Sequence, residues 1–213
     1  MNAAMNPGTD DLIPTRYSLL SRLQDWGDQE SWKVFFDTYW RLIYSVALKA
    51  GLTETEAQDV VQETVISVAK HIGKFERDRA RGSFKGWLRN IIRWRIADQI
   101  EKRTPGLQQK KTGAPSDDDE GFAFKELPDP DDPLGARWDA EWRDNLFNAA
   151  IQRVKRKVKE EHYLVFDLHV IRKWPVLKVA RKLGVSAGQV YLVKHRISAL
   201  VRRELKTLEE KPL

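Results

Sequence analysis

The sequence predicts an all-α protein with two helical domains joined by a flexible acidic linker. Apolar residues recur at helical spacing over most of the chain, and no alternating stretch is long enough to predict a strand. Residues 104–135 break the pattern, because they hold five of the nine prolines, an acidic run at 117–120 and no helical periodicity. The predicted divisions are therefore 1–103, 104–135 and 136–213.

The first helix of the N-terminal domain is predicted from an aromatic and aliphatic stripe that runs from Trp32 to Ala47 and ends at Gly51. Thr53 then forms a capping box with Glu56, which opens a second helix. The apolar face of that helix consists of Ala57, Val60, Val61, Val65, Val68 and Ile72. Both stripes are expected to face the core of this domain.

A basic loop containing glycine is expected at 73–83, followed by a third helix that begins near Phe84. This helix stops before Pro105, because proline and its predecessor resist helical geometry. Helices resume near Ala136 and continue to about Leu208. No internal repeat is present in the sequence.

Charge alternates in sign along the chain. Lys and Arg minus Asp and Glu gives −5 for residues 1–69, +7 for 70–103, −5 for 104–135 and +9 for 136–213. Clustered basic charge favours a polyanionic partner, because neutralised phosphates release their counterions. We therefore expect nucleic acid to be one partner, and a basic protein surface to face the acidic blocks.

Several classes of protein are disfavoured by composition. The chain has no Cys, which leaves neither disulfides nor thiolate metal ligands, and its four His residues are scattered. The N-terminus lacks the basic-then-apolar pattern of a signal peptide, and no stretch approaches eighteen apolar residues. No nucleophile with an adjacent base and no phosphate-binding loop is apparent. We expect a cytoplasmic, non-enzymatic protein with no cofactor, no metal and no membrane partner.

The C-terminal part contains a helix-turn-helix pattern over 176–203. Counted from Val176 as the first position, small, apolar and glycine residues occupy the positions that this motif needs, namely Val179, Ala180, Leu183, Gly184, Val185, Val190 and Val193. Pro175 suits the start of its first helix and Ser186 can cap the second. The exposed face of the second helix then carries Gln189, Tyr191, Leu192, Lys194, His195 and Arg196. A generic helical hairpin is the alternative, and His195 can be a phosphate neighbour, a cap or a base reader.

Two surfaces of the first domain suggest partners. Opposite the core stripe of the second helix lie Asp59, Gln62, Glu63 and Ile66, an apolar side chain among polar ones that suits a basic docking partner. The following loop and third helix carry Lys74, Arg77, Arg79, Arg81, Lys85, Arg89, Asn90, Arg93, Trp94 and Arg95, with Phe75, Phe84 and Trp87 between them. Cations that follow a backbone, with aromatics that stack on bases, favour single-stranded DNA binding. Trp94 is the better stacking candidate, because Trp87 lies on the apolar stripe.

These segments together resemble an extracytoplasmic-function sigma factor. The resemblance rests on AQDVVQETVISV at 57–68, GSFKGWLRNIIRWRIADQI at 82–100 and KVARKLGVSAGQVYLVKHRISALVRREL at 178–205, in that order around an acidic linker. It implies that the first domain is the family's region two and the last its region four. It also implies core RNA polymerase and promoter DNA as partners, and it admits an anti-sigma protein.

The resemblance assigns a role to each surface. Asp59, Gln62 and Glu63, with Ile66 beside them, match the face that docks on the polymerase clamp helices. The loop 75–83 and the helix after it match the part that melts the minus-ten element, and the second helix of the helix-turn-helix, from Ser186, matches the reader of the minus-thirty-five element. The linker looks like the connector that threads the RNA exit path. Trp94 departs from the Asn usual in the family, and Tyr191 and Leu192 stand where polar or basic readers are common, so the promoter sequence does not transfer.

Two other functions are weighed against this one. A stand-alone helix-turn-helix regulator that binds DNA as a dimer explains the C-terminal motif but neither the docking face nor the basic aromatic block. An enzyme acting on DNA, such as a transposase, needs carboxylates held on a rigid scaffold. The acidic run 117–120 lies instead in a predicted coil.

Overall fold

The computed structural model describes residues 16–77, 83–103 and 135–209, and every regular element in these ranges is helical. The elements in chain order are α1 (Arg16–Arg22), α2 (Gln29–Lys49), α3 (Glu54–Arg77), α4 (Phe84–Arg103), α5 (Gly135–Lys157), α6 (Glu160–Phe166), the π-helical turn η2 (Asp167–Ile171), α7 (Val176–Leu183) and α8 (Ala187–Glu209). The all-α fold class is confirmed. Of the predicted linker, residues 104–134 lie outside the described residues, and Gly135 is the first residue of α5.

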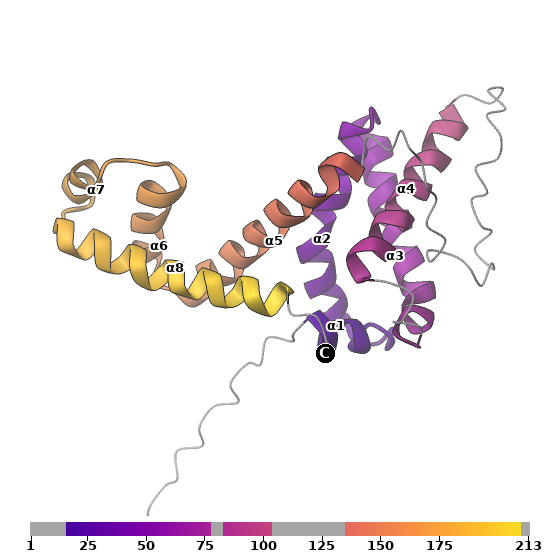
Figure 1. Cartoon of the computed structure of the whole chain (residues 1–213), viewed down its shortest axis with the longest axis horizontal. Helices are drawn as coiled ribbons and strands as arrows, with labels where there is room; N and C mark the ends of the chain where they lie inside the picture. The colour runs from indigo at the N-terminus through magenta and orange to yellow at the C-terminus, as the bar shows by residue number, and fades with distance from the viewer. Residues whose placement is uncertain (1–15, 78–82, 104–134, 210–213) are drawn as a thin grey trace, which may run out of the picture.

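Helices α1 to α4 form the first helical group, in which α3 contacts both α2 and α4 and α1 contacts α2 and α3 (Figure 1). Its centre is aromatic. The ring of Phe84 on α4 lies 6.4 Å from Phe35 and 5.7 Å from Tyr39, and all three side chains are buried. Tilted and edge-to-face ring pairs of this kind add to the free energy of burial. The predicted stripe of α2 therefore faces the core through Phe35, Tyr39, Ile43 and Ala47, whereas Phe36, also predicted on the stripe, is 43% exposed.

The chain between α2 and α3 adopts the predicted boundary. Gly51 follows the end of α2 with a φ of +86°, a left-handed conformation that glycine adopts without a Cβ clash. The Thr53 amide then donates to Glu56 Oε2 at 2.7 Å, and the Glu56 amide donates to Thr53 Oγ1 at 3.3 Å. This reciprocal pair is the capping box that the sequence predicted.

The predicted loop at 73–83 begins too early, because α3 continues to Arg77. Phe75 explains the extra turn. Its side chain is 3% exposed and its ring centroid lies 4.8 Å from that of Trp87 on α4. Glycine at position 73 costs a helix about 1 kcal/mol, and burying a phenylalanine returns about 2 kcal/mol. Residues 78–82, the remainder of the predicted loop, lie outside the described residues.

Helix α5 joins the first group to the second, since it contacts α2 near its N-terminal end and α8 towards its C-terminal end (Figure 1). Trp138 and Trp142 on α5 are 1% and 4% exposed, and Trp142 stacks on Tyr39 with ring centroids 5.6 Å apart. The buried Asn145 side chain donates from Nδ2 to the Thr38 carbonyl at 2.9 Å. Buried side chains thus run without a break from α2 through α5 to α8.

The second group contains the predicted helix-turn-helix. Helix α6 runs into η2, where the Arg172 amide donates to the Asp167 carbonyl at 2.8 Å, and Lys173 then reverses the chain with a φ of +57°. Helix α7 ends at Gly184, whose φ of +67° is also left-handed. The α7–α8 pair matches the predicted motif, whereas α1 and η2 were not predicted. No helix in the described ranges combines the length and apolar character needed to cross a membrane.

Candidate nucleic-acid and docking surfaces

The predicted docking surface is the outward side of α3, which we call the α3 face and define as Asp59, Gln62, Glu63 and Ile66. Asp59 and Gln62 are exposed, Glu63 is half-buried, and Ile66 is 40% exposed. Within the described part of the chain, neither carboxylate of this face forms an ion pair. The face therefore offers an apolar centre and two uncommitted negative charges to a partner.

A polar contact on another side of α3 holds this helix against α4. Ser67 Oγ accepts hydrogen bonds from Arg95 Nε at 2.9 Å and from Arg95 Nη2 at 2.7 Å. Arg95 also pairs with Asp98 at 3.2 Å. Because its guanidinium is committed to these groups, Arg95 serves the packing of α3 on α4, and it is not a candidate for DNA contact.

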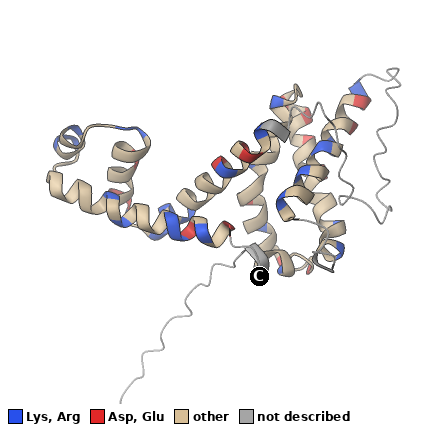
Figure 2. Cartoon of the chain, viewed as in Figure 1, with Lys and Arg blue, Asp and Glu red and all other residues tan. Residues whose placement is uncertain are grey.

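The α4 row, which we define as Lys85, Arg89 and Arg93, presents three cations at one-turn spacing along α4. All three side chains are half-buried, and Lys74 at the end of α3 is exposed. Figure 2 shows Lys and Arg as bands along α4. Lys85 is already engaged, because its Nζ lies 2.6 Å from Oδ1 of Asp139 on α5. The hydrogen bond and charge of Lys85 hold the pKa of Asp139 below its usual value.

The prediction that Trp94 stacks on a DNA base is corrected by the structure, in which this side chain is buried. Trp94 is 5% exposed and its neighbour Asn90 is 7% exposed, so neither side chain faces solvent where a base could reach it. The cause is helical spacing: Trp94 lies seven residues after Trp87 and three after Ile91, on the stripe that packs into the core. Arg77 ends α3, and Arg79 and Arg81 lie outside the described residues.

The N-terminal half of α8 presents the predicted DNA-reading surface. Lys194, His195 and Arg196 are exposed, as are Tyr191 at 56% and Leu192 at 62%. Two further predicted DNA-contact residues, Ser186 and Gln189, also cap the N-terminus of α8. The Ser186 amide donates to Gln189 Oε1 at 2.8 Å, and the Gln189 amide donates to Ser186 Oγ at 3.1 Å. These exposed side chains therefore cap α8 and fix the position of its first turn.

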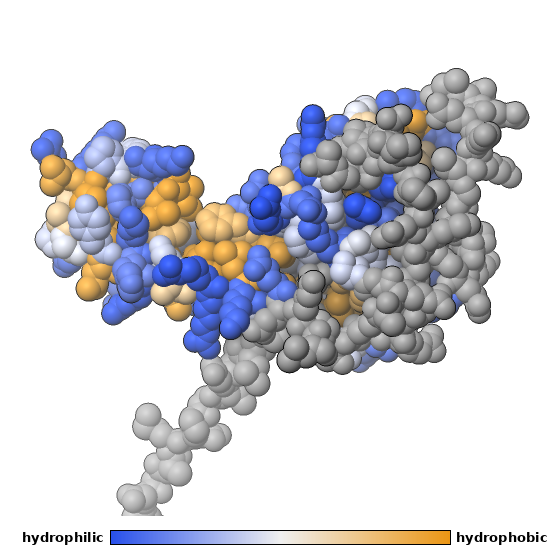
Figure 3. Space-filling model, in the orientation of Figure 1, coloured by the Kyte–Doolittle hydropathy of each residue, from blue (hydrophilic) through white to orange (hydrophobic). Residues whose placement is uncertain are grey.

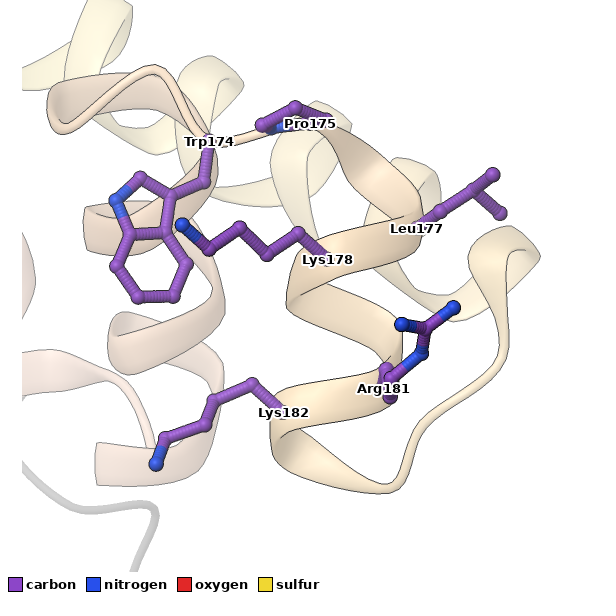
Figure 4. Close-up of a pocket in the computed structure, with 6 residues that line it drawn as sticks. All are labelled: Trp174, Pro175, Leu177, Lys178, Arg181 and Lys182. Carbon is purple, nitrogen blue, oxygen red and sulfur yellow. The ribbon is translucent and has the colours of Figure 1, made fainter.

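One basic surface was missed by the sequence reasoning. Lys178 Nζ lies 4.1 Å from the ring centroid of Trp174, and these residues line an open hollow of about 800 Å³ together with Arg181 and Lys182 (Figure 4). The signal was present in the spacing of the three cations at i, i+3 and i+4, which places them on one face of α7. Figure 3 shows apolar and hydrophilic side chains interleaved over the α6–α8 end of the molecule. The first helix of a helix-turn-helix crosses the DNA backbone, where such cations meet phosphates.

Comparison with known proteins places these surfaces in context. Residues 35–105 match the family model described as sigma-70 region 2. Over 186 residues the chain is 26% identical to the ECF RNA polymerase sigma factor SigL of Mycobacterium tuberculosis, in the H37Rv, CDC 1551 and Erdman strains. That similarity covers 84% of this chain and 89% of the relative. It therefore extends across both helical groups.

Proposed function

Because the chain is an extracytoplasmic-function sigma factor and acts in transcription initiation, we propose how its helices divide that role. The α3 face binds core RNA polymerase. The exposed side of α8 recognises the minus-thirty-five element, and the α4 row with Lys74 contacts the minus-ten element as it melts. The protein acts where the polymerase is, in the cytoplasm.

The observation that carries the polymerase contact is the exposure of Ile66 among polar neighbours. Asp59, Gln62 and Glu63 lie one turn or two turns before it on the same side of α3. An exposed isoleucine alone is ordinary on a protein surface. An apolar centre bordered by free carboxylates is the composition of a docking site, in which the apolar contact contributes affinity and the charges fix orientation.

The DNA contacts are supported by the charge of α7 and α8. Lys178, Arg181 and Lys182 on α7 suit the phosphates beside a recognition helix, and Lys194 and Arg196 lie on α8 itself. Each contact is weak alone. Joining the two DNA contacts in one polymerase complex raises their effective concentration, so the free protein is expected to bind promoters poorly.

Retention by core RNA polymerase tests the proposal. The immobilised wild-type chain should retain core polymerase and, with it, give run-off transcripts that start at defined promoters. The double variant Asp59→Lys, Glu63→Lys should lose polymerase while its thermal melting curve is unchanged. Glu101→Lys reverses an exposed charge near the end of α4 and is the matched control, which should behave as wild type.

Two results would oppose the proposal. If core polymerase is not retained by the wild-type chain, and the chain binds duplex DNA as a dimer, the stand-alone regulator is correct. If the double variant retains as much core polymerase as the wild-type chain does, core polymerase binds a surface of this protein other than the α3 face.

A further inference from the structure

The outward side of the recognition helix α8 is apolar at its centre. Val190, Val193 and Ile197 are buried and define the inward side of the helix. At 3.6 residues per turn, Leu192 points away from all three, with Gly188 one turn before it. Its exposure of 62% is among the largest of any apolar side chain in the described ranges. His195 also lies on this outward side, so Leu192 is one of the side chains that can enter a groove, and it has no hydrogen-bonding group.

Tyr191 extends this apolar surface and is supported from the neighbouring element. Its ring meets that of His169 edge to face, with centroids 6.2 Å apart and an interplanar angle of 87°. The His169 ring is in turn held by a hydrogen bond between its Nδ1 and the Trp174 carbonyl at 2.9 Å. Tyr191 is 56% exposed despite this contact, so much of its surface remains available.

Cations border the apolar centre. Lys194, His195 and Arg196 are all exposed on α8, and the α7 cations lie on the preceding helix. A partner with anionic edges and an apolar group between them fits this distribution. Duplex DNA has that composition in its major groove, where phosphates line both sides and thymine projects its C5-methyl group from the base edge.

We infer that Leu192, assisted by Tyr191, reads thymine methyl groups in the upstream promoter element. The inference rests on the proposed function of α8 and specifies what it recognises. Guanine is read by donors such as those of Arg and Lys, and adenine by the amides of Asn and Gln. Leu192 can form neither contact, whereas it can bury a methyl group against its own. The position therefore selects thymine through an apolar contact.

The test uses the holoenzyme assembled from the full chain and core RNA polymerase. A preferred upstream element is selected from random promoter DNA, and each of its thymines is then replaced singly by deoxyuridine, which removes only the methyl group. Burial of one methyl-sized group changes affinity roughly fourfold. At one position or more, we expect deoxyuridine to weaken binding of the wild-type holoenzyme by about this factor.

Variants then assign the contact to a residue. Leu192→Ala should abolish the difference between thymine and deoxyuridine at that position, and Leu192 is exposed enough for the fold to tolerate the change. Leu164→Ala, at an exposed leucine on α6, is the matched control and should keep the difference. Equal melting temperatures confirm that the variants are folded.

The outcomes separate this inference from the function beneath it. If an upstream element is selected but no thymine responds to deoxyuridine, or if Leu192→Ala keeps the full response, methyl reading is wrong and the proposed role of α8 stands. If the holoenzyme selects no upstream element, both are wrong. The deoxyuridine series on the wild-type protein gives this answer even without any variant.

Discussion

Lys85 on α4 and Asp139 on α5 form an ion pair between the first helical group and the helix that joins it to the second, with Nζ and Oδ1 2.6 Å apart. Asp139 keeps 74% of its side chain exposed, and the charge of Arg89 also contributes to lowering its pKa. A lysine that is paired with a carboxylate does not neutralise a phosphate. The pair therefore competes directly with any DNA strand that follows the α4 row.

The first prediction concerns Asp139→Asn, which frees Lys85. The free protein should bind a single-stranded oligonucleotide several-fold more tightly. The slope of log affinity against log salt concentration should steepen by about 0.7, the value for one added phosphate contact on a single strand. Fluorescence anisotropy over a salt series measures both quantities. Asp144→Asn removes an exposed charge from the same helix, one that forms no ion pair with any other described residue, and should change neither quantity. An unchanged slope for Asp139→Asn would show that Lys85 does not contact DNA.

The second prediction concerns the contact between α5 and the first group. Trp142→Ala removes a side chain that is 4% exposed and stacks on Tyr39. Truncating a buried tryptophan costs about 3–5 kcal/mol in the free energy of unfolding. Urea denaturation followed by circular dichroism measures this loss. Phe147→Ala, at a 43% exposed ring on the same helix, should cost much less, and equal losses for both variants would contradict the buried position of Trp142.

The third prediction concerns a buried charge between α5 and α8. Arg153 is 7% exposed and Glu204 is 8% exposed. Burial lowers the pKa of Arg153, and the nearby negative charge of Glu204 acts in the opposite direction. Glu204 also accepts a hydrogen bond from Lys157 at 2.8 Å.

Replacing this carboxylate leaves a buried guanidinium without compensation. We expect Glu204→Gln to lower the free energy of unfolding by about 3 kcal/mol. Chemical denaturation measures the change, with Glu209→Gln at the exposed end of α8 as the control. A loss as small as that of the control would mean that Arg153 does not depend on Glu204 for its charge balance.

The fourth prediction is a pH dependence at Glu56. A hydrogen bond from Arg103, with Nε 2.9 Å from Oε1, and donors from Thr53 lower the pKa of Glu56 from 4.5 to about 2. A carboxyl whose pKa is lower in the folded state stabilises the fold above its unfolded pKa, and this contribution disappears as pH falls towards the folded value.

The stability difference between wild type and Glu56→Gln should therefore be full above pH 4.5 and shrink as the pH falls to about 2. Thermal melting at a series of pH values measures it. The effect is expected to be small, because solvent screens this exposed pair. A difference that grew on acidification would contradict the assignment.

Local features were predictable from the sequence because a few neighbouring residues determine them. The capping box at Thr53 and the turn at Gly184 depend only on side chains within one helical turn. The exposed α3 face was likewise predictable, since the opposite stripe of that helix is apolar and must be buried.

Features that depend on the partner of a helix were not predictable. Periodicity shows which side of α5 is apolar, but it does not show that Trp138 and Trp142 are covered by the first group. The same limit explains Trp94. A tryptophan beside arginines resembles a base-stacking residue in the sequence, although its spacing from Ile91 is also that of the buried stripe, and the packing of α4 decides between the two readings.

The unbroken run of buried side chains through α5 matters for any experiment that divides this protein into fragments. If the chain is divided between 104 and 134 and the two fragments are produced apart, the contacts of Tyr39 with Trp142 and of Thr38 with Asn145 are lost. The C-terminal fragment then exposes Trp138 and Trp142 to solvent, and the N-terminal fragment loses the side chains of α5 that cover its aromatic centre. Promoter affinity measured on such a fragment would include non-specific adhesion by those rings, so the intact chain is the proper reference for its DNA-binding half.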